Sequence, residues 1–216
     1  MQLKEHNPFP LYTKKGLHTR QMIFETAVDM FSRRGYSGVS IRDITGAVKI
    51  KESSLYHHYR NKEEILTDIY DYFISQIKNT PVIDKKTLAA VPPERGHLML
   101  QKLLIDFKKV MEAPLTAKTW RILTMEQYRD DTAFEIITVH MHKFMIDYYK
   151  DFFREMIICK IIKPYDPFLL ASEYFYTLIG MFSEYNIQKY YEKNTQRLET
   201  LLFEHITFFW TRIKNK

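Results

Sequence analysis

Residues 40–66 read SIRDITGAVKIKESSLYHHYRNKEEIL, and this stretch decides the fold of the first part of the chain. Ser40 with Asp43 forms a capping-box pattern, which marks the start of a helix. The apolar residues behind this pattern recur at helical spacing over only two turns: Ile41, Ile44, Ala47 and Val48. A second segment, residues 52–59, keeps its apolar side chains on one face and polar ones on the others. The stretch therefore predicts two short helices joined by a tight turn.

Longer amphipathic helices are expected on both sides of this pair. On the amino-terminal side, Thr19 is the expected cap of a helix that runs to about Arg34 and is ended by Gly35. On the carboxyl-terminal side, a capping pattern at Asn61 begins a helix over residues 62–79. Two short helices braced by longer ones form a helix-turn-helix unit, whose second short helix can present polar side chains to bases and phosphates.

Composition and patterning favour a globular, all-α chain. Its 216 residues are 45% hydrophobic and 27% charged, with 6 Gly and 8 Pro, which excludes disordered and collagen-like classes. Hairpin dipeptides and sustained period-two alternation are missing. Helical patterns continue beyond a Pro- and Gly-bearing loop at residues 80–96, over 97–112, 115–128, 131–161, 166–192 and 195–214. We expect about nine helices: an N-terminal three-helix helix-turn-helix domain and a C-terminal helical bundle.

The organisation that follows has three parts. Residues 1–17 are expected to form a flexible basic arm and residues 18–66 the helix-turn-helix domain. Residues 67–216 form the second region, which the helix at 62–79 links to the first. Residues 1–66 hold 11 Lys and Arg against 7 Asp and Glu, within a chain whose net charge is +6. A basic excess on a compact helical unit is typical of proteins that bind the phosphate backbone.

The cysteine content indicates a reducing compartment, and the sequence carries no catalytic or metal-binding motif. Cys159 is the only cysteine and cannot form an internal disulfide, so we expect a cytoplasmic protein. The longest uncharged apolar stretch, residues 174–182, is far shorter than the roughly 20 residues of a membrane span, so no membrane association is expected. Phosphate-binding loops, zincin motifs and nucleophile elbows are missing, and the one Glu-x-x-His motif lies at the edge of the 80–96 loop. We expect no enzyme, no cofactor and no metal.

The order and spacing of residues 40–44 (SIRDI) and 53–66 (SSLYHHYRNKEEIL) resemble the DNA-binding domain of tetracycline-repressor (TetR) family regulators. The resemblance covers about residues 17–66 and extends to the rest only as an architecture, a variable helical region for ligand binding and dimerisation. It implies a DNA-binding transcriptional regulator, a repressor by family expectation. Such a regulator binds a palindromic double-stranded DNA operator as a homodimer and is released by a small-molecule effector.

The resemblance also implies which residues contact DNA. Lys62, at the start of the fourth helix, would hold a phosphate with its ammonium group and the free backbone N–H groups there. Arg42 matches guanine O6 and N7 bidentately. The full expected set is Ser40, Arg42, Ser53, Ser54, Tyr56, His57, His58 and Lys62. Two positions depart from the family pattern: Lys49 replaces a turn glycine, and Glu52 replaces a non-acidic residue and would repel phosphate.

Aromatic and methionine side chains gather on the helices of the second region, where flexible Met beside rigid rings suits an adaptable pocket for a bulky, largely apolar effector. Glu173 could select a cationic or hydrogen-bonding ligand. The expected effector-binding set is Trp120, Tyr128, Met141, Phe144, Met145, Tyr148, Glu173 and Tyr176. The alternative for each apolar residue is ordinary core packing, and for Glu173 it is a solvated or salt-bridged carboxylate.

The helices at 166–192 and 195–214 carry more apolar side chains than one core needs. This excess suits a homodimer in which both helices pair with their twins, with Gly180 permitting close approach. An effector in the bundle would then tilt the helix at 62–79 and change the separation of the two recognition helices. The alternative is a helical dimer whose helix-turn-helix binds protein rather than DNA, for which Glu52 is the best support.

Overall fold

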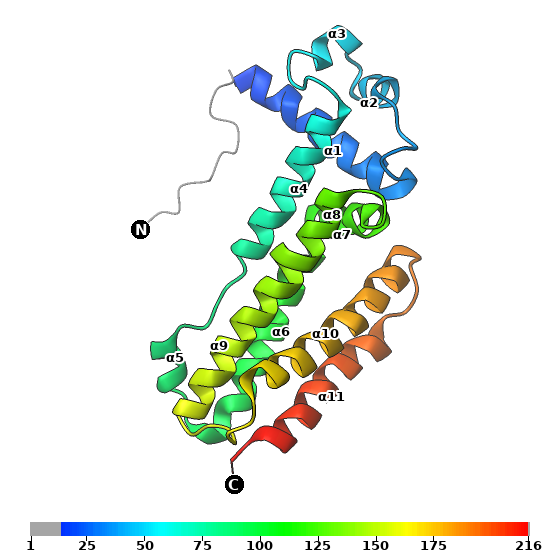
Figure 1. Ribbon diagram of the computed structural model, residues 1–216. Coiled ribbons are helices and arrows are strands. Elements are labelled where there is room, and N and C mark those ends of the chain that lie inside the picture. Colours follow the sequence, from blue (N-terminus) through cyan, green and yellow to red (C-terminus); the bar gives the residue numbers. More distant parts are fainter. Residues whose placement is uncertain (1–13, 216) are drawn as a thin grey trace. The chain divides into compact units, whose positions relative to one another are not determined.

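The computed structural model describes residues 14–215 (Figure 1). Among these residues the regular structure is helical, and the only β pairing is an isolated bridge between Ile162 and Lys214. The prediction of an all-α chain is therefore confirmed. None of the described helices is long and apolar enough to cross a membrane.

The first four helices follow the predicted order. They are α1 (Lys14–Arg34), α2 (Ile41–Val48), α3 (Glu52–Leu55) and α4 (Lys62–Lys78). The capping box of α2 is confirmed, since Ser40 Oγ accepts from Asp43 N at 3.1 Å and the Asp43 carboxylate accepts from Ser40 N at 2.8 Å. Gly35 follows α1 with a φ of 71°, the left-handed conformation expected of a helix-ending glycine.

Two predicted helix ends in this region are wrong. Helix α1 begins at Lys14, before the expected cap Thr19, and Gly16 lies inside it, because one glycine costs about 1 kcal/mol, which is too little to end a helix of this length. Lys14 to Leu17 are thus helical, and residues 1–13 of the expected arm lie outside the described residues. Helix α3 ends at Leu55 rather than near residue 59, and turns follow.

The remaining elements are longer and mostly match their predicted ranges. They are α5 (Lys85–Ala89), a 3₁₀ turn (Pro93–Arg95), α6 (Gly96–Glu112), α7 (Pro114–Glu126), α8 (Asp131–Glu135), a π-helix (Ile136–Lys143), α9 (Phe144–Ile158), α10 (Pro167–Tyr190) and α11 (Gln196–Ile213). The expected loop at 80–96 contains α5, because Asp84 caps it by accepting from Thr87 N at 2.7 Å. The predicted helix at 131–161 is interrupted by the π-helix.

The described chain divides into two compact units. The first comprises residues 14–75 and 114–134, so it takes in α7 as well as the helix-turn-helix segment. In this unit α1 packs on α2 and α7. Its fully buried side chains include Ile23, Phe31, Ile44, Leu55, Ile65, Ile69 and Phe73.

The second unit comprises residues 76–113 and 135–215. Figure 1 shows α9, α10 and α11 side by side, and α11 also packs on α6. The core is aromatic, with Phe153, Tyr174, Phe175 and Phe182 buried. Gly96 lies against the Trp210 ring, where an added Cβ would be only 2.4 Å from Trp210 Cη2.

Candidate nucleic-acid interface

A buried arginine supports the segment Ser53–His57, which we call the recognition segment. Arg20 of α1 is 6% exposed, and its Nη2 lies 2.6 Å from Asp68 Oδ2 of α4. Its Nη1 donates to the backbone carbonyl of His58, and its guanidinium carbon lies 4.0 Å from the centre of the Tyr59 ring. One side chain thus joins α1, α4 and the turn after α3. The sequence signal was available, because Arg20 shares the buried face of α1 with Ile23.

Hydrogen-bonded turns follow α3. The His58 and Tyr59 N–H groups both return to Leu55 O, at 2.8 and 3.0 Å, and the His58 carbonyl accepts from Arg20. Burial, reinforced by the Arg20 charge, lowers the pKa of His58, so its imidazole is neutral near pH 7. Burial raises the pKa of the Tyr59 phenol, and the Asp68 charge adds to this.

The expected DNA-contacting residues fall into two groups by exposure. Tyr56 is 52% exposed, and Ser53 and His57 are also exposed. Ser54 and His58 are half-buried on the same segment. The segment from Ser53 to His57 therefore presents hydroxyl, phenol and imidazole groups to solvent, as a DNA reader requires.

Arg42 and Glu52 are paired across the turn. Arg42 Nε donates to Glu52 Oε1 at 2.9 Å, while the Arg42 side chain is 86% exposed. The acidic departure at Glu52 therefore lies beside a basic residue of the expected contact set. Sequence patterns could not reveal this pair, because the two residues lie in different helices.

Lys62 is more enclosed than expected. Its Nζ donates to Tyr36 O at 3.1 Å and to Val39 O at 2.9 Å, and it lies 4.0 Å from the centre of the Tyr36 ring. Two of its three N–H donors thus hold the turn between α1 and α2 against α4. The Tyr36 hydroxyl also donates to Glu63 Oε1 at 2.8 Å. The phosphate contact expected of Lys62 stays a prediction.

Helix α7 contacts α1 and the turn that joins α1 to α2. Glu126, 5% exposed, accepts from the Tyr36 backbone N–H at 3.0 Å. Lys118 Nζ lies 2.6 Å from Asp29 Oδ1 of α1, and this hydrogen bond lowers the pKa of Asp29 despite partial burial. The sequence reading placed α7 in the other region and therefore missed this support.

Lys49, which replaces the turn glycine of the family pattern, adopts the left-handed conformation. Lys49 ends α2 with φ 60° and ψ 43°, and its N–H bonds back to Gly46 O and Thr45 O. A side chain with a Cβ thus occupies a conformation that glycine adopts without steric cost.

The expected effector residues are spread over both units. Trp120 and Tyr128 belong to the first unit, where Trp120 is buried and stacks on Phe73 at 5.8 Å, while Tyr128 is 91% exposed. The other six belong to the second unit. A single pocket formed by all eight residues stays a prediction.

In the second unit, Met141 and Met145 are buried, whereas Phe144, Glu173 and Tyr176 are exposed. The Tyr148 hydroxyl accepts from Ile83 N at 3.0 Å. The structure adds His142, which is not in the expected effector-binding set. The half-buried His142 ring lies 5.7 Å from the Phe175 ring and 6.0 Å from the Tyr176 ring, and burial lowers its pKa.

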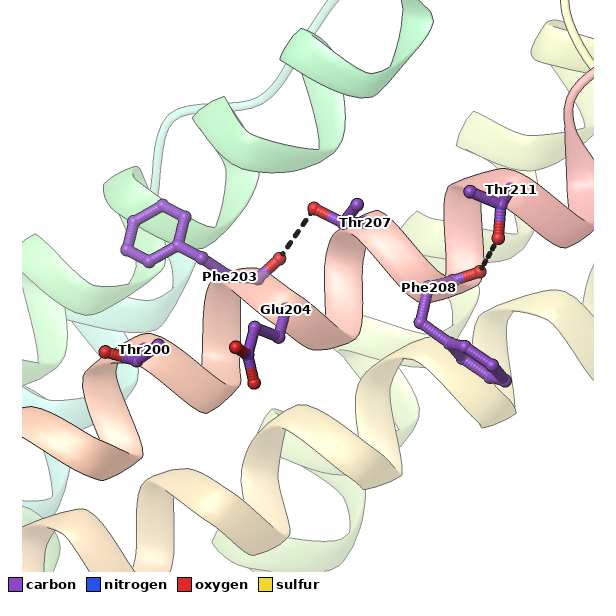
Figure 2. Close-up of a pocket in the computed structure, with 6 residues that line it drawn as sticks. All are labelled: Thr200, Phe203, Glu204, Thr207, Phe208 and Thr211. Carbon is purple, nitrogen blue, oxygen red and sulfur yellow. Dashed lines mark hydrogen bonds between the residues drawn. The ribbon is translucent and has the colours of Figure 1, made fainter.

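A shallow hollow lies on the exposed face of α11 (Figure 2). It is lined by Thr200, Phe203, Glu204, Thr207, Phe208 and Thr211. None of these belongs to the expected effector set. The Thr207 and Thr211 hydroxyls donate back to Phe203 O and Phe208 O, at 3.1 and 2.6 Å, so both hydroxyls are engaged within the helix. The face is therefore largely apolar.

Taken together, these features define a helical protein with a helix-turn-helix unit, and the described residues hold no cluster of three or more side chains suited to a metal. Residues 23–69 match the family model described as bacterial regulatory proteins, tetR family. The helix-turn-helix segment of the chain is therefore similar to this family of regulatory proteins.

A curated relative agrees with this assignment over the same segment. The Staphylococcus epidermidis biofilm operon icaADBC HTH-type negative transcriptional regulator IcaR is 42% identical over 59 residues, which are 26% of this chain and 32% of that protein. The chain thus spans about a third of the length of this relative.

Solved structures extend the likeness of fold beyond that segment. A putative TetR-family transcriptional regulator from Mesorhizobium loti superposes with a TM-score of 0.62 at 16% identity, covering 94% of this chain and 100% of that one. AibR in complex with isovaleryl coenzyme A and operator DNA gives 0.54 at 22% identity, covering 76% and 83%. At these identities the likeness concerns the fold.

Proposed function

We propose that the protein is a transcriptional repressor that binds a palindromic DNA operator as a homodimer. The observation that carries this proposal is the exposed segment Ser53–His57, which is held on a rigid base by the buried Arg20–Asp68 pair. Rigid support limits the conformational freedom that a recognition surface loses on binding. Repression is supported by the relative IcaR, which is named a negative regulator.

A second copy of the chain is the proposed partner of α10 and α11. Phe168, Leu169, Tyr176 and Ile187 of α10 are 52–58% exposed, and Phe208 of α11 is 60% exposed. Helices with so many exposed apolar side chains suit an isologous four-helix interface. Two copies would present two recognition segments to half-sites about one helical turn apart, which accounts for a palindromic operator.

The proposed effector is a bulky, largely apolar small molecule bound in the second unit. Support comes from the adaptable side chains Met141 and Met145 and from the His142 ring beside Tyr176. Helix α4 begins in the first unit and its last residues, 76–78, belong to the second. An effector that displaces the end of α4 would therefore act on the recognition segment through Asp68, and DNA would in turn weaken effector binding by the same factor.

The test is a fluorescence-anisotropy titration of the protein against DNA duplexes from promoter regions at two salt concentrations. The duplexes include the promoter region beside the gene that encodes this protein. We expect selective binding whose affinity falls steeply with salt, because counterions are released from each contacted phosphate. Tyr56→Ala should alter preference between sites. Tyr165→Ala is the matched control, since Tyr165 is an exposed tyrosine that lies outside the recognition segment.

Two outcomes would contradict the proposal. If folded protein binds no duplex selectively at low salt, a helix-turn-helix that binds protein becomes the better reading. If Tyr56→Ala and Tyr165→Ala change the preference between sites equally, the recognition segment does not select the DNA sequence.

A further inference from the structure

The Arg42–Glu52 pair uses one particular edge of the guanidinium group. The bond runs from Nε to Glu52 Oε1 at 2.9 Å. A guanidinium has five N–H donors, one on Nε and four on the two terminal nitrogens. The pair thus engages the Nε edge and leaves the terminal fork, which is the bidentate donor for guanine O6 and N7, available to another acceptor.

The acid that is nearer in sequence is engaged elsewhere. The Asp43 carboxylate accepts from Ser40 N and Ser40 Oγ, at 2.8 and 2.7 Å, and lies 3.5 Å from Arg34 Nη2. These hydrogen bonds with Ser40, with the Arg34 charge, lower the pKa of Asp43. Glu52 is therefore the acid that orients Arg42.

This pair contributes little to holding the fold together. The Arg42 and Glu52 side chains are 86% and 43% exposed, and solvated ion pairs of this kind have small net effects on stability. Its effect on a bound polyanion is larger, because Glu52 repels phosphate while it holds the neighbouring cation. A residue that weakens the general attraction to DNA and orients one side chain is suited to selectivity.

We propose that Glu52 is a positioning residue for base recognition, which aims the terminal fork of Arg42 at a guanine edge and keeps it from the phosphate backbone. This inference rests on the proposed DNA-binding function and deepens it by naming a specificity determinant. It gives the departure at Glu52 a role in selectivity and makes guanine the base that each half-site presents to Arg42.

The test measures base preference directly. The full-length protein selects from a pool of duplexes with a randomised centre, and the selected sequences give the preference at each position. Wild type should select guanine at one position of each half-site. Glu52→Ala should reduce that preference about tenfold, within the discrimination that one bidentate contact provides. It should also raise affinity for random duplex and steepen the salt dependence by about one phosphate contact, because Arg42 becomes free to bind the backbone.

Matched variants separate positioning from charge. Glu52→Gln keeps an oxygen acceptor for Arg42 and should restore part of the guanine preference while still raising affinity for random duplex. Arg42→Ala should abolish that preference, and adding Glu52→Ala to it should change the preference no further. Glu25→Ala removes an exposed acid from α1 in the same unit and should leave the preference unchanged.

The outcomes distinguish this inference from the function beneath it. If wild type selects a palindrome but Glu52→Ala selects the same bases with the same strength, Glu52 does not position Arg42, and DNA binding stands. The same conclusion follows if Glu52→Ala shifts preference equally in the Arg42→Ala background. If wild type selects no sequence at either salt concentration, both the inference and the proposed function are overturned.

Discussion

Arg20 and Asp68 join the first and fourth helices through an ion pair of 2.6 Å whose side chains are only 7% and 20% exposed. Replacing Asp68 with Asn should lower the free energy of unfolding by about 2–3 kcal/mol, because it leaves a buried guanidinium without its counter-charge. Urea unfolding of the two proteins measures this. Arg33→Met is the control: its partner Asp29 is half-exposed, and a change of at most about 0.5 kcal/mol is expected. Equal changes in the free energy of unfolding would show that the buried ion pair stabilises the protein no more than the exposed one.

Glu126 should matter for stability although it lies far along the chain from the turn that it contacts. Glu126→Ala removes the acceptor of the Tyr36 backbone N–H, which lies 3.0 Å from Oε1. A buried donor without a partner costs about 1–3 kcal/mol, so a loss of this size is expected in thermal or urea unfolding. Glu126→Gln keeps an acceptor oxygen and should lose less. If Glu126→Gln and Glu126→Ala are equally destabilising, the loss of stability does not come from this hydrogen bond.

Lys49→Gly should stabilise the protein. Lys49 has a φ of 60°, and the steric cost of this conformation for a residue with a Cβ exceeds the entropy that glycine loses, which leaves a net gain of about 0.5–1 kcal/mol. Lys49→Ala removes the same charge but keeps the Cβ, so it should show no such gain. The denaturant midpoints of the three proteins decide the matter, and equal midpoints for Gly and Ala would mean that the turn holds no relievable strain.

Phe208→Asp should convert the proposed dimer into a monomer. The side chain is 60% exposed in the protomer, so its replacement should leave the fold intact while placing a charge in an apolar interface. Light scattering during size-exclusion chromatography measures the mass, and circular dichroism checks the helices. Val82→Asp, at a similarly exposed valine in the loop before α5, should remain dimeric. A dimeric Phe208→Asp variant would place the interface elsewhere. A monomeric wild-type protein would mean that there is no dimer.

Glu112 should make stability depend on acid pH. Burial opposes its ionisation, but hydrogen bonds from Tyr185, Lys189 and Lys108 outweigh this and lower the pKa of Glu112 below 4.5. A lowered folded-state pKa stabilises the protein above the unfolded value, and this contribution is lost as the pH falls through the folded value. Glu112→Gln should therefore be less stable than wild type at neutral pH, with a difference that shrinks below pH 4.5. Urea unfolding across this range would contradict the prediction if the difference stayed constant.

Local signals predicted much of the fold, whereas contacts between distant residues were not predictable. The Ser40 cap and the Gly35 turn depend on neighbouring residues, and both were correct. The turn after α3 is held by Arg20, which bonds to a carbonyl 38 positions away. Periodicity identified the effector candidates as apolar helix faces, but it does not show which faces meet: Met141 is buried, whereas Tyr128 projects into solvent. The orientation of Arg42 is likewise a property of the turn and not of either helix.

The π-helix at Ile136–Lys143 changes the number of residues per helical turn between α8 and α9. Hydrogen bonds from i to i+5 enclose one more residue per turn than those of an α-helix, so spacing across this segment no longer reports which side chains share a face. A residue lost elsewhere in a helix rotates everything after it by about 100°. In this segment the loss of one residue would convert the π-helix into an α-helix, so α9 would keep its orientation. A deletion of one residue from this segment is thus expected to leave the packing of α9 unchanged.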